Sequence, residues 1–135
     1  MSKAVALVSA IAMFLFVSSG VYASQNHVVV SLQPINASGV TGTVRLRQLA
    51  NDGTLIRVKA TDLNSGEQYL SIYYDNATCA LVADSIPNDV IGYYTANHRG
   101  RGRVSHAVDD PLNKIHSVSV RKNDANHTLV ACASF

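Results

Sequence analysis

Histidine is the side chain here best suited to hold a metal, and the chain of 135 residues contains five. Copper needs several imidazoles converging at about 2 Å, and zinc needs three or four nitrogen, sulfur or carboxylate ligands. None of the five histidines is spaced as His-x-His or His-x3-His. Scattered histidines are more often surface residues, so the sequence predicts no metal site. The weak alternative candidates are His98, His106 and His116.

The clearest local concentration of charge is the segment 98–103, which reads His-Arg-Gly-Arg-Gly-Arg. Guanidinium groups donate paired hydrogen bonds to phosphate, sulfate or carboxylate. Arg99, Arg101 and Arg103 are therefore candidate anion-binding residues on a mobile turn, and a solvated turn is the alternative. The partner we expect is a protein, an anionic glycan or a lipid surface. A net charge of only +2 gives no general attraction to nucleic acid, which we do not expect as a partner.

Tyrosines cluster on two strand-like segments, 69–74 and 93–94. Alternation along a strand sends Tyr69 and Tyr73 to one face and Tyr74 to the other. Because exposed tyrosines make good recognition surfaces, Tyr74 is a candidate partner-binding residue. The alternative is that these tyrosines fill the core.

The first 23 residues have the pattern of a secretory signal peptide. Lys3 gives a positive start, residues 4–17 are almost all apolar, and the segment 21–23 ends on a small residue suited to cleavage. The apolar run is shorter than the about 20 residues that span a membrane, although a retained anchor helix is the alternative. We therefore expect residues 24–135 to form one exported domain, periplasmic or secreted, that does not span a membrane after cleavage.

The chain has two cysteines, Cys79 and Cys132. In an oxidising compartment such a pair forms a disulfide, here between a loop in the middle of the chain and the last strand. Two free buried thiols are the alternative.

The remaining sequence alternates between apolar and polar residues, with turns at short intervals. This pattern predicts an all-β fold, an eight-stranded antiparallel Greek-key barrel or sandwich. Asn51-Asp52-Gly53 predicts a hairpin with a type I′ turn, and residues 97–102 are expected to close a second hairpin. The expected strands are 28–33, 40–49, 55–61, 69–75, 93–96, 103–108, 115–121 and 128–134.

Several segments, taken in order, resemble a copper–zinc superoxide dismutase domain over most of residues 24–135. The resemblance implies the same barrel fold, and it includes both cysteines. The segments that carry it are Val30–Pro34, Ser38–Val44, Thr61–Gly66, Asp75–Cys79, Thr95–Val104 and Leu129–Cys132.

The positions at which this family carries its metal ligands hold other residues. Its His-x-His pair corresponds to Ser71-Ile72-Tyr73, and the loop 80–91 contains no histidine. Arg121 stands where a further copper ligand is expected, and Leu129 stands at the position of an anion-guiding arginine. Without the metal, no side chain can supply its redox chemistry.

The sequence also lacks a Gly-x-Ser-x-Gly motif and a phosphate loop, so it predicts no catalytic residue. We therefore expect a non-enzymatic, metal-free, superoxide dismutase-like module with a binding or structural role and no cofactor. The alternative is a divergent copper or zinc enzyme of the superoxide dismutase type that uses histidines outside the family pattern.

Overall fold

The computed structural model describes residues 26–135, and the predicted signal peptide, residues 1–23, lies outside the described residues. Within this part, no helix is long and apolar enough to cross a membrane. A single 3-10 turn, Leu112–Lys114, interrupts the described strands. The strands are β1 (His27–Pro34), β2 (Thr41–Gln48), β3 (Thr54–Thr61), β4 (Gln68–Tyr74), β5 (Val90–Thr95), β6 (Gly102–Val108), β7 (Ser117–Lys122) and β8 (Leu129–Ser134).

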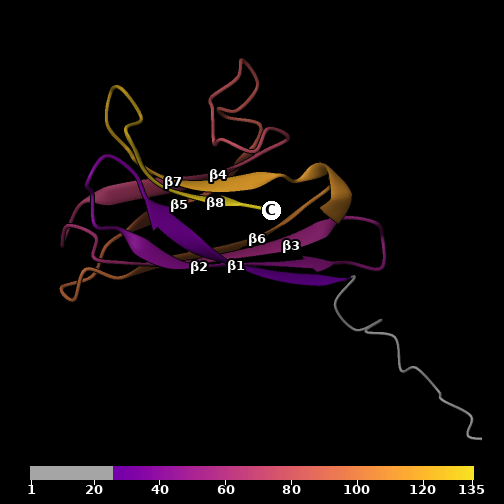
Figure 1. The fold of residues 1–135 in the computed structure, drawn as a ribbon, viewed down its shortest axis with the longest axis horizontal. Helices are drawn as coiled ribbons and strands as arrows, with labels where there is room; N and C mark the ends of the chain where they lie inside the picture. The colour runs from indigo at the N-terminus through magenta and orange to yellow at the C-terminus, as the bar shows by residue number, and fades with distance from the viewer. Residues whose placement is uncertain (1–25) are drawn as a thin grey trace, which may run out of the picture.

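The eight strands form one antiparallel sheet in the order β5-β4-β7-β8-β1-β2-β3-β6, which curls into a nearly closed barrel (Figure 1). Two four-stranded halves face each other, β1-β2-β3-β6 and β5-β4-β7-β8. They are joined through β1 and β8 by only two residue pairs, Gln33–Cys132 and Pro34–Ala131. Since β3 pairs with β6 and β4 pairs with β7, some connections join strands that are not neighbours in the sheet, as in a Greek key. The predicted fold class is confirmed.

The two halves differ in how they meet solvent. In β3, buried and exposed residues alternate: Ile56 and Val58 enter the core, while Arg57 and Lys59 point outward. β4 and β7 are instead buried on both faces along nearly their whole length. The loop after β4, with the disulfide, covers their outer side and packs on Leu70 and Ile72. The described part of the chain therefore has an open sheet face on the β1-β2-β3-β6 half.

Two turns differ from expectation. In the β2–β3 turn, Asp52 is left-handed (φ 66°), whereas Gly53 lies outside that region, so the turn is not the predicted type I′ turn. A Cβ on Gly53 would lie 2.6 Å from the carbonyl oxygen of Val108, which explains the glycine by close approach instead. Residues 97–101 do not close a hairpin, because β5 pairs with β4 and β6 pairs with β3. This segment crosses between the two halves.

Cys79 and Cys132 form the predicted disulfide, with their Cα atoms 6.0 Å apart. It ties the loop after β4 to β8 across 53 residues of chain. Both cysteines lie in a small apolar cluster with Tyr74.

Removing this bridge should destabilise the domain strongly. Closing a loop of this length contributes on the order of 4 kcal/mol in the chain-entropy model. The double variant Cys79→Ala/Cys132→Ala should lose about that much free energy of unfolding in urea. Wild-type protein unfolded under a reductant is the control, and it should approach the double variant. Equal unfolding midpoints for oxidised and reduced wild type would contradict the prediction.

Candidate anion-binding face

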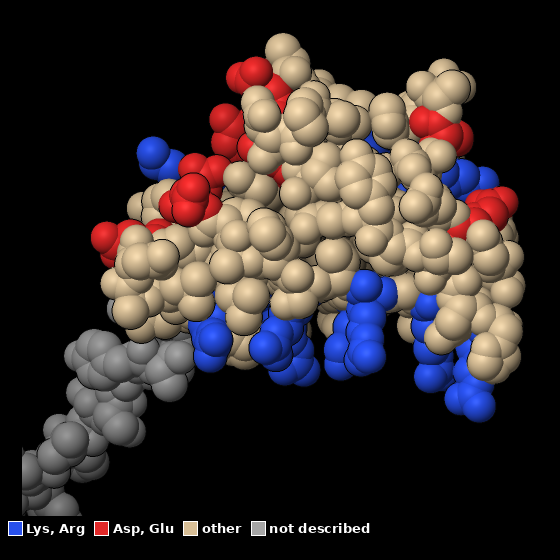
Figure 2. All heavy atoms as spheres, turned by 180° about the vertical axis from the view of Figure 1, so that it is seen from behind, with Lys and Arg blue, Asp and Glu red and all other residues tan. Residues whose placement is uncertain are grey.

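Five cationic side chains stand on the open sheet face, and we call them the basic face: Arg45, Arg47, Arg57, Lys59 and Arg103. All five are exposed. They come from β2, β3 and β6. In β2 and β3 the cations alternate with buried residues, and in β6 Arg103 lies between the partly buried Gly102 and Val104. In Figure 2 blue side chains project in a row from this side of the molecule, and the red acidic side chains lie elsewhere.

The strand register sets cations directly against each other. Arg45 is paired with Arg57 across β2 and β3, and Lys59 is paired with Arg103 across β3 and β6. Neighbouring strands are only about 4.8 Å apart, and like charges in opposed positions destabilise a sheet. The free protein therefore holds a repulsion that a bound anion would relieve.

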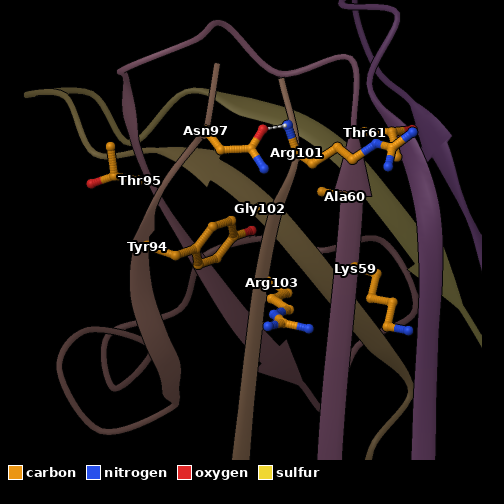
Figure 3. A pocket seen from close by; sticks show the side chains of 9 residues that line it. All are labelled: Lys59, Ala60, Thr61, Tyr94, Thr95, Asn97, Arg101, Gly102 and Arg103. Carbon is orange, nitrogen blue, oxygen red and sulfur yellow. Dashed lines mark hydrogen bonds between the residues drawn. The ribbon is translucent and has the colours of Figure 1, made fainter. Parts of the chain in front are cut away.

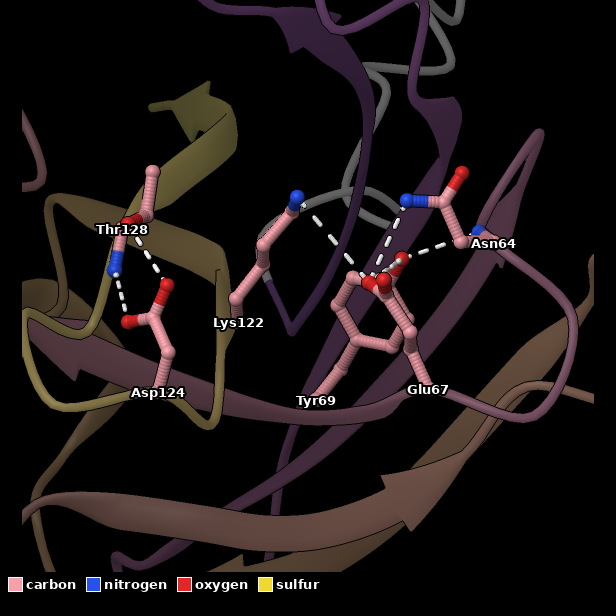
Figure 4. A network of polar contacts seen from close by, with 6 residues as sticks. All are labelled: Asn64, Glu67, Tyr69, Lys122, Asp124 and Thr128. Carbon is pink, nitrogen blue, oxygen red and sulfur yellow. Dashed lines mark hydrogen bonds and ion pairs between the residues drawn. The ribbon is translucent and has the colours of Figure 1, made fainter.

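No carboxylate offsets these charges. The strands β1, β2, β3 and β6 contain no Asp or Glu. Within residues 26–135 a single ion pair occurs, Lys122 Nζ to Glu67 Oε2 at 3.9 Å, and it lies outside the basic face (Figure 4). Since the cations have no internal partner within 4 Å, their donors are available to a ligand.

Four hollows lie between the cations. The largest, about 570 Å³, is bordered by Lys59, Arg101 and Arg103, with the Tyr94 ring lying against Gly102 (Figure 3). The next, about 510 Å³, lies between the side chains of β3 and β6 and also borders Arg57. Two smaller ones lie among the arginines of β2 and β3. Each hollow is therefore flanked by at least two cationic side chains.

The predicted arginine turn is held by hydrogen bonds to one side chain. The Asn97 Oδ1 atom accepts hydrogen bonds from the backbone N–H groups of Arg99 (2.9 Å) and Arg101 (3.0 Å). Gly100 is left-handed, and a Cβ there would lie 2.6 Å from the Leu63 carbonyl oxygen. The turn is therefore held by hydrogen bonds and packs closely against Leu63.

The three candidate arginines have separate positions. Arg99 lies in the turn, Arg101 borders the largest hollow, and Arg103 belongs to the basic face. In β2 and β3, alternation with buried residues turns Arg45, Arg47, Arg57 and Lys59 outward. Nothing local showed that they share one surface with Arg103.

Tyr74 is buried, with 2% of its surface exposed, so it offers no surface to a partner. Its hydroxyl lies 2.7 Å from Ser119 Oγ and accepts a hydrogen bond from Arg121 Nε at 3.0 Å. The expectation of an outward-facing residue fails because the loop after β4 covers this side of the strand. Tyr93 is the exposed tyrosine of the cluster instead.

Ser71 and Arg121, which the sequence resemblance sets at metal-ligand positions, do not fit a copper or zinc ion. Ser71 Oγ is paired with Tyr94 Oη at 2.8 Å inside the barrel. The guanidinium of Arg121 donates to the carbonyl oxygens of Cys79 (2.6 Å) and His127 (2.7 Å) and to the Tyr74 hydroxyl. A guanidinium cation has no acceptor lone pair, and each of its three nitrogens here donates a hydrogen bond, so Arg121 supplies no metal ligand.

The alternative histidines are not brought together. His98, His106 and His116 are all exposed, and the first two lie near opposite ends of β6. Among residues 26–135, no group of three His, Cys, Asp or Glu side chains is placed to hold a metal.

Comparison with known proteins bears on the architecture. No protein-family model matches the chain, and no curated protein matches it. Among solved structures, a mutant of superoxide dismutase 5 from Candida albicans aligns with a TM-score of 0.50 and 13% identity, covering 81% of this chain and 90% of that chain. The chain has a superoxide dismutase-like fold. At this identity the likeness concerns the fold alone, and it agrees with the resemblance noted in the sequence.

Replacing Arg121 tests its structural role. Arg121→Met would remove the donor to the buried carbonyl oxygen of Cys79, to the partly buried carbonyl oxygen of His127 and to the Tyr74 hydroxyl. We expect a loss of about 2–4 kcal/mol in free energy of unfolding, because unsatisfied buried polar groups are costly. Lys122→Met is the matched control, and its half-exposed ion pair should contribute at most about 1 kcal/mol. Equal losses in the two variants would contradict this role.

Buried tyrosines make the fold sensitive to alkali. Burial raises the pKa of Tyr73 above its usual value, and the carboxylates of Asp110 and Asp89 raise it further. Burial likewise raises the pKa of Tyr94, partly opposed by the Ser71 hydrogen bond. In the unfolded chain these tyrosines ionise near pH 10, at a lower pH than in the folded chain. Their contribution to the free energy of unfolding is therefore complete below about pH 10 and is lost as pH rises.

Urea unfolding should therefore show a midpoint that falls above about pH 10, together with a rise in tyrosinate absorbance that coincides with unfolding. Tyr73→Phe should reduce this slope, since it removes one of the groups responsible. Tyrosinate absorbance from Tyr73 and Tyr94 in a protein that stays folded would contradict the assignment.

Proposed function

We propose that this protein is an exported, non-catalytic module of superoxide dismutase-like fold that binds anionic ligands on its basic face. The observation that carries the proposal is the set of five exposed cations on strands that contain no carboxylate. Arginine supplies four of the five, and its planar donors suit phosphate, sulfate and carboxylate groups.

Export is supported by two features of the chain. The first 23 residues read as a signal peptide, and the Cys79–Cys132 disulfide suits an oxidising compartment. Outside the cytosol, anionic polymers and surfaces are the abundant acidic partners. Ten Lys and Arg against nine Asp and Glu in residues 24–135 leave almost no net charge. Attraction must therefore be local.

A non-catalytic role is supported by the chemistry at the family's metal positions. Ser71 and Arg121 are engaged with neighbouring groups, and neither supplies the imidazole donors that copper requires. The polar interior of the β4–β7 half thus serves packing and hydrogen bonding. The exposed cationic side chains lie on the other half of the barrel.

Binding to immobilised heparin, as a model polyanion, tests the proposal. Arg57→Gln/Lys59→Gln should weaken binding at least about tenfold, since each lost charge-assisted hydrogen bond contributes about 1.5–3 kcal/mol. Wild-type binding should also fall steeply with salt, because exposed charges are screened beyond about 8 Å at physiological ionic strength. The melting temperature should not fall, because the variant removes opposed like charges.

The charge-matched control is Lys114→Gln/Lys122→Gln, which lies outside the basic face and should bind like wild type. Arg99→Gln tests the turn separately and should have little effect. Equal weakening in face and control variants, or no binding at low salt, would contradict the proposal. One equivalent of tightly held copper in the purified protein, together with superoxide dismutation, would favour the metalloenzyme alternative.

A further inference from the structure

We infer that the occupant of the basic face is one extended acidic polysaccharide chain, lying diagonally from Arg47 on β2 to Arg101 beyond the start of β6. The inference rests on the proposed function and specifies its ligand. It follows from how the hollows are connected, how long their path is and which side chains line it.

The four hollows form a continuous path, because each shares cationic side chains with the next. We count them from the hollow beside Arg47 to the largest one, beside Arg101. The first two share Arg45 and Arg57. The second and third share Arg57 and Lys59. The third and fourth share Lys59 and Arg103. The positive charge therefore follows a line across three strands, as a linear polyanion requires.

The register gives the path its length. Arg47 is paired with Leu55 of β3, and Thr61, at the far end of β3, borders the same hollow as Arg101. Along the strands, the six-residue rise from Leu55 to Thr61 covers about 20 Å. Across the strands, the two inter-strand spacings from β2 to β6 cover about 10 Å. The diagonal is about 22 Å long. Several acidic groups of one chain can lie along it together.

Small polar groups line the path between the cations. Thr43 borders the second hollow and Ser105 the third, while Thr61, Thr95 and Asn97 border the fourth. Hydroxyl and amide groups can exchange hydrogen bonds with sugar hydroxyls, as well as with charged groups. The lining thus matches a chain that carries both kinds of group.

Within residues 26–135, the same face offers one exposed large apolar side chain, Val29, for insertion into a membrane, and no exposed aromatic ring on which single-stranded nucleic acid could stack. Surface-bound membrane proteins insert large apolar or aromatic residues, and single-stranded nucleic acids stack on exposed aromatic rings. Among the described residues, the exposed large hydrophobics of the other half include Tyr93, Leu81 and Val82, whereas the basic half exposes Val29. The polysaccharide is therefore the occupant that this face fits best.

The test is a series of heparin oligosaccharides of increasing length, titrated against the full domain by calorimetry. Affinity should rise with length until the chain spans about 22 Å and then level off per binding site. Arg47→Gln and Arg101→Gln, at the two ends of the path, should each weaken a spanning chain about tenfold, the loss of about 1.4 kcal/mol. Each should change the affinity of the shortest binding chain much less, because a short chain can sit between the remaining cations.

The controls separate this inference from the proposed function. Lys114→Gln should leave every affinity unchanged, and circular dichroism should show equal melting temperatures for all variants. Affinity that does not depend on length, or tighter binding to phosphatidylserine vesicles than to long heparin, would overturn the polysaccharide while leaving an anion-binding face. Absence of binding to both at low salt would overturn the proposed function as well.

Discussion

The pairing of β2 and β3 with the core beneath them is the constraint on which the rest depends. Val44 lies opposite Val58, and both are fully buried. A slip of one residue would turn every side chain of a strand over and send Arg57 into the barrel. Burying an unpaired guanidinium costs several kcal/mol. The apolar inner face thus holds the register, and the register holds the outer cations in opposed pairs.

In the opposite half of the barrel, the outer face of the sheet is covered by a loop and not exposed to solvent. The Cys79–Cys132 bridge brings the loop after β4 against β8, and Arg121 holds the same loop through the carbonyl oxygen of Cys79. The two contributions differ in kind. The bridge reduces the conformational entropy of the unfolded chain, and the guanidinium donates hydrogen bonds to polar atoms that the loop buries. Together they explain why a seven-residue strand such as β4 is buried on both faces although the sheet is antiparallel.

The sequence predicted most of this architecture because its signals are local. Alternation located all eight strands within a few residues of their observed bounds. It could not place Arg103 beside Lys59, since those strands pair across some forty residues of intervening chain. It also placed Tyr74 outward, correctly for a bare strand, but the covering loop is a tertiary feature with no periodic signal. The Asp52 turn shows the same limit. The glycine at position 53 is required by the close approach of the Val108 carbonyl, which is distant in the sequence, and not by the turn type.

The separation of the two halves bears on how such a scaffold can be used. Ser71 and Arg121 belong to β4 and β7, whereas the basic face belongs to β2, β3 and β6. The two regions share a core and one bordering side chain, Tyr94, which is paired with Ser71 and also lines the largest hollow. The hydrogen bonds of Ser71 and Arg121 involve none of the five cations of the basic face. Conversely, the repulsion among the cations acts on exposed side chains in water, where it is screened and small compared with the burial of Val44, Ile56 and Val58 beneath them. The barrel can therefore carry an unpaired charged surface without weakening the packing that positions it.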